Sequence, residues 1–322
     1  SVEEVQSEIE GTGYIGPVGL TAVIAALYFK DKETDFNIYE CGKGARYDDV
    51  SVIYSKGSVI NTVFEEHIPE LGQNLEEIAF NKAGVIKESQ DFVVIGEQSE
   101  VVYNIIKNEA ENQGVKLIDF DRNYKYNIIN KGTICDIDVY KNLILGVFGE
   151  HQVKNTSIAL KVVKEMGIQI DEINLRKALE DLKLPGRIEK ISENPLIYLD
   201  GCINRKSAIY VKEIIDKVDK NKVIYVVGIP DSKDFKGVVE VVGNQRDEII
   251  VTKTNIEHLE FKLKQERILE DIVNKKVYAS ENLLKAMDLA YSLYEKGDII
   301  CILGTQSLVK DTKLYFGQDT LG

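Results

Sequence analysis

The chain has 322 residues, which is enough for two domains of ordinary size, each with its own core. Its formal net charge of −13 at pH 7 argues against a nucleic-acid partner, because binding a phosphate backbone requires clustered Lys and Arg. No stretch approaches the ~18 uncharged apolar residues of a membrane span, and the acidic segment Ser1–Glu4 is unlike a signal peptide. We therefore expect a cytoplasmic protein with no nucleic-acid or membrane partner.

Taken in chain order, short apolar runs alternate with amphipathic stretches, which is the pattern of parallel sheets covered by helices. Strands are predicted at Phe36–Tyr39, Ser58–Val63, Phe92–Ile95, Leu117–Phe120, Leu196–Leu199, Val223–Val227, Glu248–Val251 and Asp298–Leu303. Helices are predicted at Leu20–Phe29, Leu75–Lys82, Val101–Gln113, Val153–Met166 and Glu281–Tyr294. Between residues 124 and 148, alternating β-prone residues around a turn at Asn130–Gly132 predict a small antiparallel insert.

A domain boundary is predicted near Leu184–Gly186, where a helical pattern stops at Pro and Gly and a new α/β series begins. Hydrophobic residues make up 44% of the chain, which gives both parts enough apolar side chains for a core. The sequence thus predicts an α/β fold with one domain over residues 1–184 and a second over residues 185–322.

The glycine-rich segment Gly11–Gly16 matches two phosphate-binding patterns in part. Its GxGxxG spacing, with an acid at Glu40 after a predicted strand, suits a dinucleotide site. The acidic residues before it, however, are too polar for the buried strand that such a site requires. The same spacing suits a Walker loop, but Pro17 and Val18 stand where that loop needs Lys and Ser or Thr. Binding of NAD through Gly11–Gly16 stays open as an alternative.

Three later segments occur in the order of a known family's motifs. They are Tyr39–Asp48 (YECGKGARYD), Asn61–Lys87, which ends in KAGVIK, and Gly149–Asn155 (GEHQVKN). Together they resemble the central domain of folylpolyglutamate synthases and Mur ligases, whose pattern there is roughly EVGLGGRLDATN, then T-x-I-x-x-DH with EKAGIIK, then G-x-HQ-x-x-N. Leu184–Glu189 resembles the family's PGR hinge, and Asp200–Arg205 resembles its DGAHNP motif. The resemblance implies a shortened Mur-ligase-type central domain followed by a smaller Rossmann-like domain.

The resemblance also implies the chemistry of an ATP-dependent ligase, in which an amino group attacks an acyl phosphate and forms an amide bond. In the family, the glutamate matching Glu40 and the histidine matching His67 help to hold a divalent metal. The lysine matching Lys82 is often carbamylated and supports a second metal. We therefore predict a metal site at these three residues. The residue types alone also allow a plainer interpretation, with Glu40 at a strand end, His67 in a loop and Lys82 on a solvated helix face.

Further residues are predicted, through the resemblance, to be vestiges of a nucleotide-binding site. They are Arg187, Asp200, Asn204, His151, Gln152 and Asn155. The family's DGAHNP histidine is Ile203 in this chain, and Ile can neither donate nor accept a hydrogen bond. The proline of that motif is Arg205. Because so few residues precede Leu20, where the resemblance begins, we expect the family's GTNGKGS phosphate loop to be missing.

These departures make a non-catalytic binding or accessory subunit of a larger complex the first hypothesis. Loss of elements that cover the sheet should expose an apolar surface, which predicts a protein partner or a homo-oligomer at that surface. The second hypothesis is an ATP-dependent amide ligase, using Mg²⁺ and ATP as cofactors, that is completed by a partner chain or a preceding segment. The third is the NAD-binding protein described above.

Overall fold

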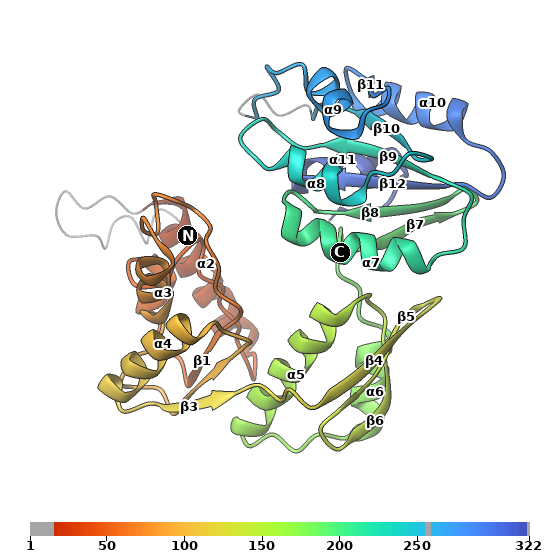
Figure 1. Ribbon diagram of the computed structural model, residues 1–322. Coiled ribbons are helices and arrows are strands. Elements are labelled where there is room, and N and C mark those ends of the chain that lie inside the picture. Colours follow the sequence, from red (N-terminus) through yellow and green to blue (C-terminus); the bar gives the residue numbers. More distant parts are fainter. Residues whose placement is uncertain (1–15, 255–258, 321–322) are drawn as a thin grey trace. The chain divides into compact units, whose positions relative to one another are not determined.

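The computed structural model describes residues 16–254 and 259–320 (Figure 1). Its contacts divide the chain into two compact units. Unit 1 holds the residues up to Arg122 together with Lys154–Ile170, and unit 2 holds Asn123–Val153 together with the residues from Asp171 onward. Each unit contains a parallel sheet with helices packed against it, which confirms the predicted α/β class. None of the helices in the described ranges is both long and apolar enough to cross a bilayer.

Unit 1 is built on a three-stranded parallel sheet in the order β1-β2-β3. Its first elements are α2 (Pro17–Lys32), the 3-10 helix η1 (Asp49–Val52), β1 (Gly57–Ile60), α3 (Leu75–Ala83), β2 (Phe92–Ile95), α4 (Glu100–Gln113) and β3 (Lys116–Asp119). The central strand β2 is buried along its whole length, and its Val93 and Ile95 share a core with Ile78 of α3 and Ile106 of α4. The apolar stripes of these two amphipathic helices therefore supply the core of this unit.

The ends of α3 and α4 follow from local side-chain chemistry. The side chain of Asn74 accepts a hydrogen bond from the N–H of Glu77 at the start of α3. Ser99 does the same for the N–H of Val102 at the start of α4. Both side chains satisfy amides that have no partner within their helix. The helix α4 ends at Gly114, whose φ of 69° is the left-handed conformation typical of a glycine cap.

Unit 2 begins with a three-stranded antiparallel sheet, which confirms the insert predicted between residues 124 and 148. Its strands are β4 (Tyr124–Ile129), β5 (Gly132–Ile137) and β6 (Tyr140–Leu145). At Gly132 the φ is 146°, and a Cβ there would lie 1.9 Å from the carbonyl oxygen of Leu145, so the turn requires glycine. Two helices follow, α5 (Glu150–Glu165) and α6 (Glu172–Glu180), and α5 continues from unit 2 into unit 1.

The larger sheet of unit 2 has six strands in the order β11-β10-β9-β12-β8-β7. Its elements are β7 (Glu189–Glu193), β8 (Leu196–Asp200), α7 (Arg205–Lys217), β9 (Val223–Gly228), α8 (Phe235–Val242), β10 (Glu248–Val251), α9 (Gln265–Val273), β11 (Tyr278–Ala279), α10 (Leu283–Leu293), β12 (Ile299–Gly304) and α11 (Gln306–Tyr315). All neighbouring strands run parallel except β7 and β8. The sheet begins shortly after residue 184, and the domain boundary expected there stays a prediction.

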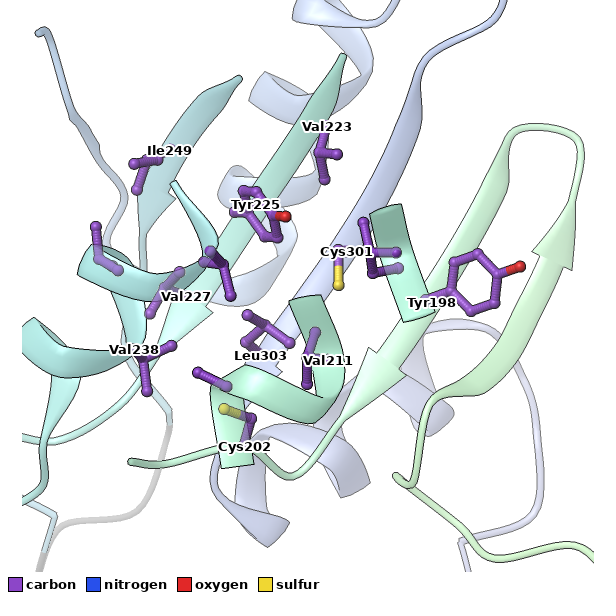
Figure 2. Close-up of a cluster of buried hydrophobic side chains, with 14 of the residues drawn as sticks. Tyr198, Cys202, Val211, Val223, Tyr225, Val227, Val238, Ile249, Cys301 and Leu303 are labelled. Atoms are coloured by element: carbon purple, nitrogen blue, oxygen red, sulfur yellow. The ribbon is translucent and has the colours of Figure 1, made fainter. Parts of the chain in front are cut away.

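Helices cover both faces of this sheet, so its central strands are apolar at every position. On β9, Tyr225 and Val227 point into one buried cluster with α7, α8 and α9 (Figure 2). The alternate residues Ile224 and Val226 point into a second cluster with α10 and α11. Successive side chains of a strand alternate between the two faces of the sheet. A strand that is buried on both faces therefore has apolar residues at every position of its sequence.

One predicted strand is wrong. Phe36–Tyr39 has no regular secondary structure and does not form part of a sheet, and its Phe36 and Ile38 are 59% and 86% exposed. The other predicted strands correspond to β1, β2, β3, β8, β9, β10 and β12, and the predicted helices to α2, α3, α4, α5 and α10. A strand needs a neighbour to satisfy its backbone groups, and none lies beside Phe36–Tyr39 among the described residues.

Candidate functional site

The first candidate site is the edge of the larger sheet at the carboxyl ends of β8, β9 and β12, and we call this edge the crevice, after the place where open parallel sheets bind their ligands. The helices that follow β8 and β9, namely α7 and α8, pack on one face of the sheet, whereas α11 after β12 packs on the other. Ligands of open parallel sheets bind at the carboxyl ends of two neighbouring strands whose following helices lie on opposite faces of the sheet. At this edge the main chains of β9 and β12 meet closely, because a Cβ on Gly304 would lie 2.4 Å from the carbonyl oxygen of Gly228.

Asp200 ends β8 and is only 8% exposed. Its carboxylate accepts a hydrogen bond from the N–H of Ile188 at 2.8 Å. Burial raises the pKa of this carboxyl to about 6, against the opposing effects of the Ile188 amide, the Arg187 charge and the Cys202 amide. The N–H of Gly201 also donates to the carbonyl of Gly186 at 2.8 Å. Asp200 therefore fastens the chain entering the sheet to the end of β8.

Arg187 lies across Gly201, beside the first residue of α11. A Cβ on Gly201 would lie 2.6 Å from Arg187 Nη1 and 2.9 Å from Gln306 Nε2, so glycine is needed for the two side chains to occupy this space. Arg187 Nη1 donates to the carbonyl of Gly186 at 3.2 Å. A guanidinium beside the amino end of a helix is suited to an anion such as a phosphate or a carboxylate.

Asn204 and Asp234 hold the loops that border the crevice. The side chain of Asn204 caps α7 by accepting the N–H of Ser207 at 2.9 Å. Asp234 caps α8 through the N–H of Gly237 at 2.9 Å and also accepts the N–H of Arg205 at 3.0 Å. Asp234 thus ties the start of α8 to the start of α7, with Oδ1 capping its own helix and Oδ2 bonded to the Arg205 amide. As a helix cap, Asn204 has a structural task in addition to any ligand contact.

Two neighbours of Asn204, Ile203 and Cys202, pack in the core of unit 2. Ile203 packs against the buried cluster that α7, α8 and α9 share, so its apolar side chain contributes to the core. Burial raises the pKa of the Cys202 thiol to about 12, so this thiol stays protonated and is a poor nucleophile. The structure gives both residues packing roles.

The predicted nucleotide residues on α5 are divided between the units. His151 and Gln152 belong to unit 2, where the His151 ring lies 4.7 Å from the ring of Tyr210 on α7 and Gln152 is buried. Asn155 belongs to unit 1, where its Oδ1 accepts a hydrogen bond from Asn61 Nδ2 at 3.0 Å. The structure thus brings Arg187, Asp200 and Asn204 to one crevice, and a single site for all six residues stays a prediction.

A second polar network lies at the carboxyl ends of β1 and β2 in unit 1. Gln98 donates to the carbonyl of Asn61 at 2.8 Å and accepts the N–H of Val63 at 3.0 Å. Beside it, Lys154 of α5 forms an ion pair with Glu97 at 2.7 Å. This end of a parallel sheet is the usual ligand-binding end. The hydrogen bond from Asn61 to Asn155 connects two of the segments that resemble the family, Asn61–Lys87 and Gly149–Asn155.

His67 and Lys82 lie in a chain of charged side chains. Lys82 Nζ is 2.8 Å from Glu66 Oε1 and donates to the carbonyl of Lys43 at 3.2 Å. On the two sides of its ring, His67 Nε2 is 3.9 Å from Glu66 and Nδ1 is 3.7 Å from Glu70. Because these carboxylates face opposite ring nitrogens, they do not converge with His67 on one point. The ammonium of Lys82 further occupies the space beside Glu66.

Glu40 is exposed, in the irregular segment that precedes the Gly42 turn. That turn is fixed by Asp48, whose Oδ2 accepts the N–H of Gly42 at 2.9 Å. Within residues 16–254 and 259–320, no group of three or more His, Cys, Asp or Glu is arranged to hold a metal ion. As the side chains lie, Glu40, His67 and Lys82 do not fit such an ion, and metal binding by them stays a prediction. The segment Gly11–Gly16 falls outside the described residues except for Gly16.

Sequence reasoning missed two residues at this edge. Thr305 and Gln306 follow the end of β12, and the Oγ1 of Thr305 is buried without a hydrogen-bond partner in the described structure. The signal that could have identified them is positional, because each is a polar residue just beyond a wholly apolar strand. In parallel sheets such positions gather at one edge.

Two family models match the chain. The Mur ligase middle domain matches residues 13–163, and the Mur ligase glutamate ligase domain matches residues 186–306. Among curated relatives, the dihydrofolate synthase/folylpolyglutamate synthase of Bacillus subtilis is 31% identical over 194 residues, covering 56% of this chain and 45% of the relative. Its counterpart in Mycobacterium tuberculosis is 26% identical over 295 residues, covering 86% of this chain and 60% of the relative. The chain therefore spans about half the length of these relatives.

Solved structures share the fold over nearly the whole chain. The Mycobacterium tuberculosis folylpolyglutamate synthase complexed with ADP has a TM-score of 0.86 and 24% identity, and the match covers 98% of this chain and 75% of that one. The bifunctional folylpolyglutamate synthase/dihydrofolate synthase of Yersinia pestis, complexed with AMPPNP and Mn, has a TM-score of 0.82 and 22% identity. These likenesses show the fold.

Proposed function

Because the chain belongs to the folylpolyglutamate synthase and Mur ligase family, we propose that it acts in ATP-dependent formation of an amide bond between a carboxylate and an amino acid. The names of the relatives suggest glutamate as the amino acid and a folyl compound as the other substrate. The observation that carries the proposal is the arrangement of Arg187, Gly201 and Gln306 at the carboxyl ends of β8 and β12.

The reaction transfers the terminal phosphate of ATP to a substrate carboxylate, which gives an acyl phosphate and ADP. The amino nitrogen then attacks the acyl carbon, the carbon–oxygen bond to phosphate breaks, and inorganic phosphate leaves. The proton released by the amine passes to solvent. Both steps involve anionic oxygen atoms, so a site for this chemistry needs fixed positive groups.

Unit 2 offers such groups at its crevice. The guanidinium of Arg187 can pair with two oxygens of a phosphate or a carboxylate at once. The amino ends of α7 and α11 add the positive ends of two helix dipoles beside β8 and β12. Asp200 and Asp234 keep these groups in place through the amides of Ile188 and Arg205. Preorganised donors of this kind need little rearrangement during the reaction.

A non-catalytic accessory role was the first hypothesis from the sequence, and the relatives do not support it, because their names are those of synthases. The substitution of Ile203 for histidine, on which that hypothesis partly depends, has a structural account in core packing. The absence of a phosphate loop stays a prediction.

The proposal is tested by ligand binding and by product formation. The purified chain should bind ADP in a calorimetric titration, and Mg²⁺-ATP should raise its unfolding midpoint by several degrees at about a hundred times the dissociation constant. With ATP, glutamate and a folyl substrate, mass spectrometry should detect a product that is longer by one glutamyl residue. A chain that binds no adenine nucleotide at millimolar concentration and forms no product would contradict the proposal.

A further inference from the structure

Lys313 on α11 carries a buried charge that the proposed reaction does not use. Only 7% of its side chain is exposed. Its Nζ lies 3.2 Å from Oε1 of Glu189, the first residue of β7. Among the residues that the structure describes, Glu189 is the one carboxylate that pairs with this ammonium. A charge is costly to bury and needs a partner inside the fold, so the placement of Lys313 depends on Glu189.

The second carboxylate oxygen of Glu189 holds the main chain just before Arg187. Glu189 Oε2 accepts the N–H of Gly186 at 2.8 Å. Because Gly186 is buried, its amide needs an acceptor within the fold. The carbonyl of the same glycine accepts the N–H of Gly201 at 2.8 Å and Nη1 of Arg187 at 3.2 Å. Glu189 therefore links the ammonium of Lys313 to the residue that immediately precedes Arg187.

One face of α11 contacts this part of the chain at three levels. Gln306, Val309 and Lys313 are spaced by three and four residues, which places them on the same side of the helix. A Cβ on Gly201 would lie 2.9 Å from Gln306 Nε2. A Cβ on Gly186 would lie 2.8 Å from the side chain of Val309. Lys313 supplies the third contact, and it is the one that carries a charge.

We infer that Lys313 is a positioning residue for Arg187 and acts on it through Glu189. With the ammonium in place, both oxygens of the Glu189 carboxylate are engaged and the Gly186 amide stays bonded. Without the ammonium, the Glu189 side chain, which is already 24% exposed, turns to water and releases that amide. The guanidinium then takes several directions and binds an anion less tightly, because binding has to order it. The inference rests on the proposed function, in which Arg187 binds a phosphate or a carboxylate.

Limited digestion with trypsin tests the inference without any ligand. Trypsin cuts after Arg187 when the chain opens there, so the rate of this cut, followed by mass spectrometry, measures how firmly Arg187 is held. Lys313→Met should speed the cut about tenfold or more, whereas Lys313→Arg keeps the charge and should keep the cut near its native rate. Lys222→Met is the matched control, because Lys222 pairs at 3.7 Å with the buried Asp298 at the amino ends of β9 and β12. It also leaves a carboxylate without its ammonium, but the cut should stay slow.

Calorimetric titration with ADP tests whether the effect passes through Arg187. Lys313→Met should weaken ADP binding about fivefold or more in the otherwise native chain. In the Arg187→Ala background the same substitution should change the affinity by less than about twofold, because the group that Lys313 positions is absent. Equal weakening in both backgrounds would mean that Lys313 acts by another route, and would overturn the inference.

The trypsin cut has two outcomes that would also overturn the inference: an unchanged rate in Lys313→Met, or an equally fast cut in Lys222→Met. If Lys313→Met folds poorly, its combination with Glu189→Gln removes both charges, leaves no unpaired ion and makes the same comparison. A native chain that binds no ADP would count against the proposed function alone, because the trypsin cut still decides whether Lys313 holds Arg187 in place.

Discussion

The carboxylate of Asp200 accepts a hydrogen bond from the N–H of Ile188, a residue with the left-handed φ of 50°. A β-branched residue rarely adopts this conformation, and the surrounding structure must hold it there. The bond fixes the short connection between Gly186 and Ile188 that positions Arg187. A buried carboxylate at the end of β8 thus controls the direction of an exposed guanidinium.

Asp200→Asn should change how stability depends on pH. The carboxyl has a pKa of about 6 in the folded chain and 3.8 as its ordinary value, so folding favours its protonated form. In the native protein this group adds its full contribution, roughly 3 kcal/mol, to the free energy of unfolding below pH ~4. That contribution is lost as the pH rises through ~6. Asn does not ionise, so the variant should not lose this stability as the pH rises. The free energy of unfolding of the native chain should therefore fall relative to that of the variant between pH ~4 and ~6. Urea unfolding of both proteins at several pH values measures this difference, and Asp219→Asn, at an exposed position, is the control.

Asn204→Ala should separate capping from ligand binding. The loss of the hydrogen bond to the Ser207 amide should lower the free energy of unfolding by about 1 kcal/mol. Asn282→Ala removes an equivalent cap from α10, where Asn282 accepts the Lys285 amide at 3.0 Å, and should cost about the same. Only Asn204→Ala should also weaken ADP binding in calorimetry. Equal binding by both variants would leave Asn204 with a capping role alone.

Arg187→Ala should remove about half of the stabilisation of the chain by adenine nucleotide, if it weakens binding about tenfold. A ligand present at a hundred times its dissociation constant adds ~2.7 kcal/mol, and a tenfold weaker site at the same concentration adds about half of that. Arg187→Lys should recover only part, because an ammonium lacks the paired donors of a guanidinium. Arg246→Ala makes the same charge change before β10, at the opposite end of the sheet, and serves as the control. Thermal unfolding with and without Mg²⁺-ATP compares the three variants.

Ile302→Ala should destabilise unit 2 strongly. Ile302 is wholly buried on β12 in the cluster shared with α10 and α11, and its truncation should cost about 2–5 kcal/mol through lost burial and a residual cavity. Ile173→Ala, at an exposed position of α6, should stay within about 0.5 kcal/mol of the native chain. Urea denaturation followed by far-UV circular dichroism gives both values. A small effect at Ile302 would indicate a looser core than the structure describes.

The sequence predicts the strands of the core well because their environment is uniform. The strands β2 and β10 have the predicted bounds, since polar residues border apolar runs that are buried on both faces. Phe36–Tyr39 has the same kind of pattern but no strand beside it, and a sequence pattern does not report whether a neighbour is present. Several amphipathic helices were missed, among them α7 and α8, which are set by the caps Asn204 and Asp234.

The candidate site could be predicted only in part. Motif resemblance identified Arg187, Asp200 and Asn204, which the fold places at one crevice. It did not indicate that Asp200 faces the Ile188 amide, or that Lys82 pairs with Glu66. Such pairings join segments that are far apart in the chain, so they depend on how the chain folds rather than on any local pattern.

The close approach of the main chains at Gly228 and Gly304 has a consequence for directed evolution of this scaffold. Any side chain at Gly304 would collide with the neighbouring strand, so a mutant library that varies this position would consist mostly of misfolded members. Diversity in ligand choice has to come from the residues around this edge, such as Arg205 and Gln306 at the first positions of α7 and α11. A library restricted to such positions samples new specificities while leaving the sheet intact.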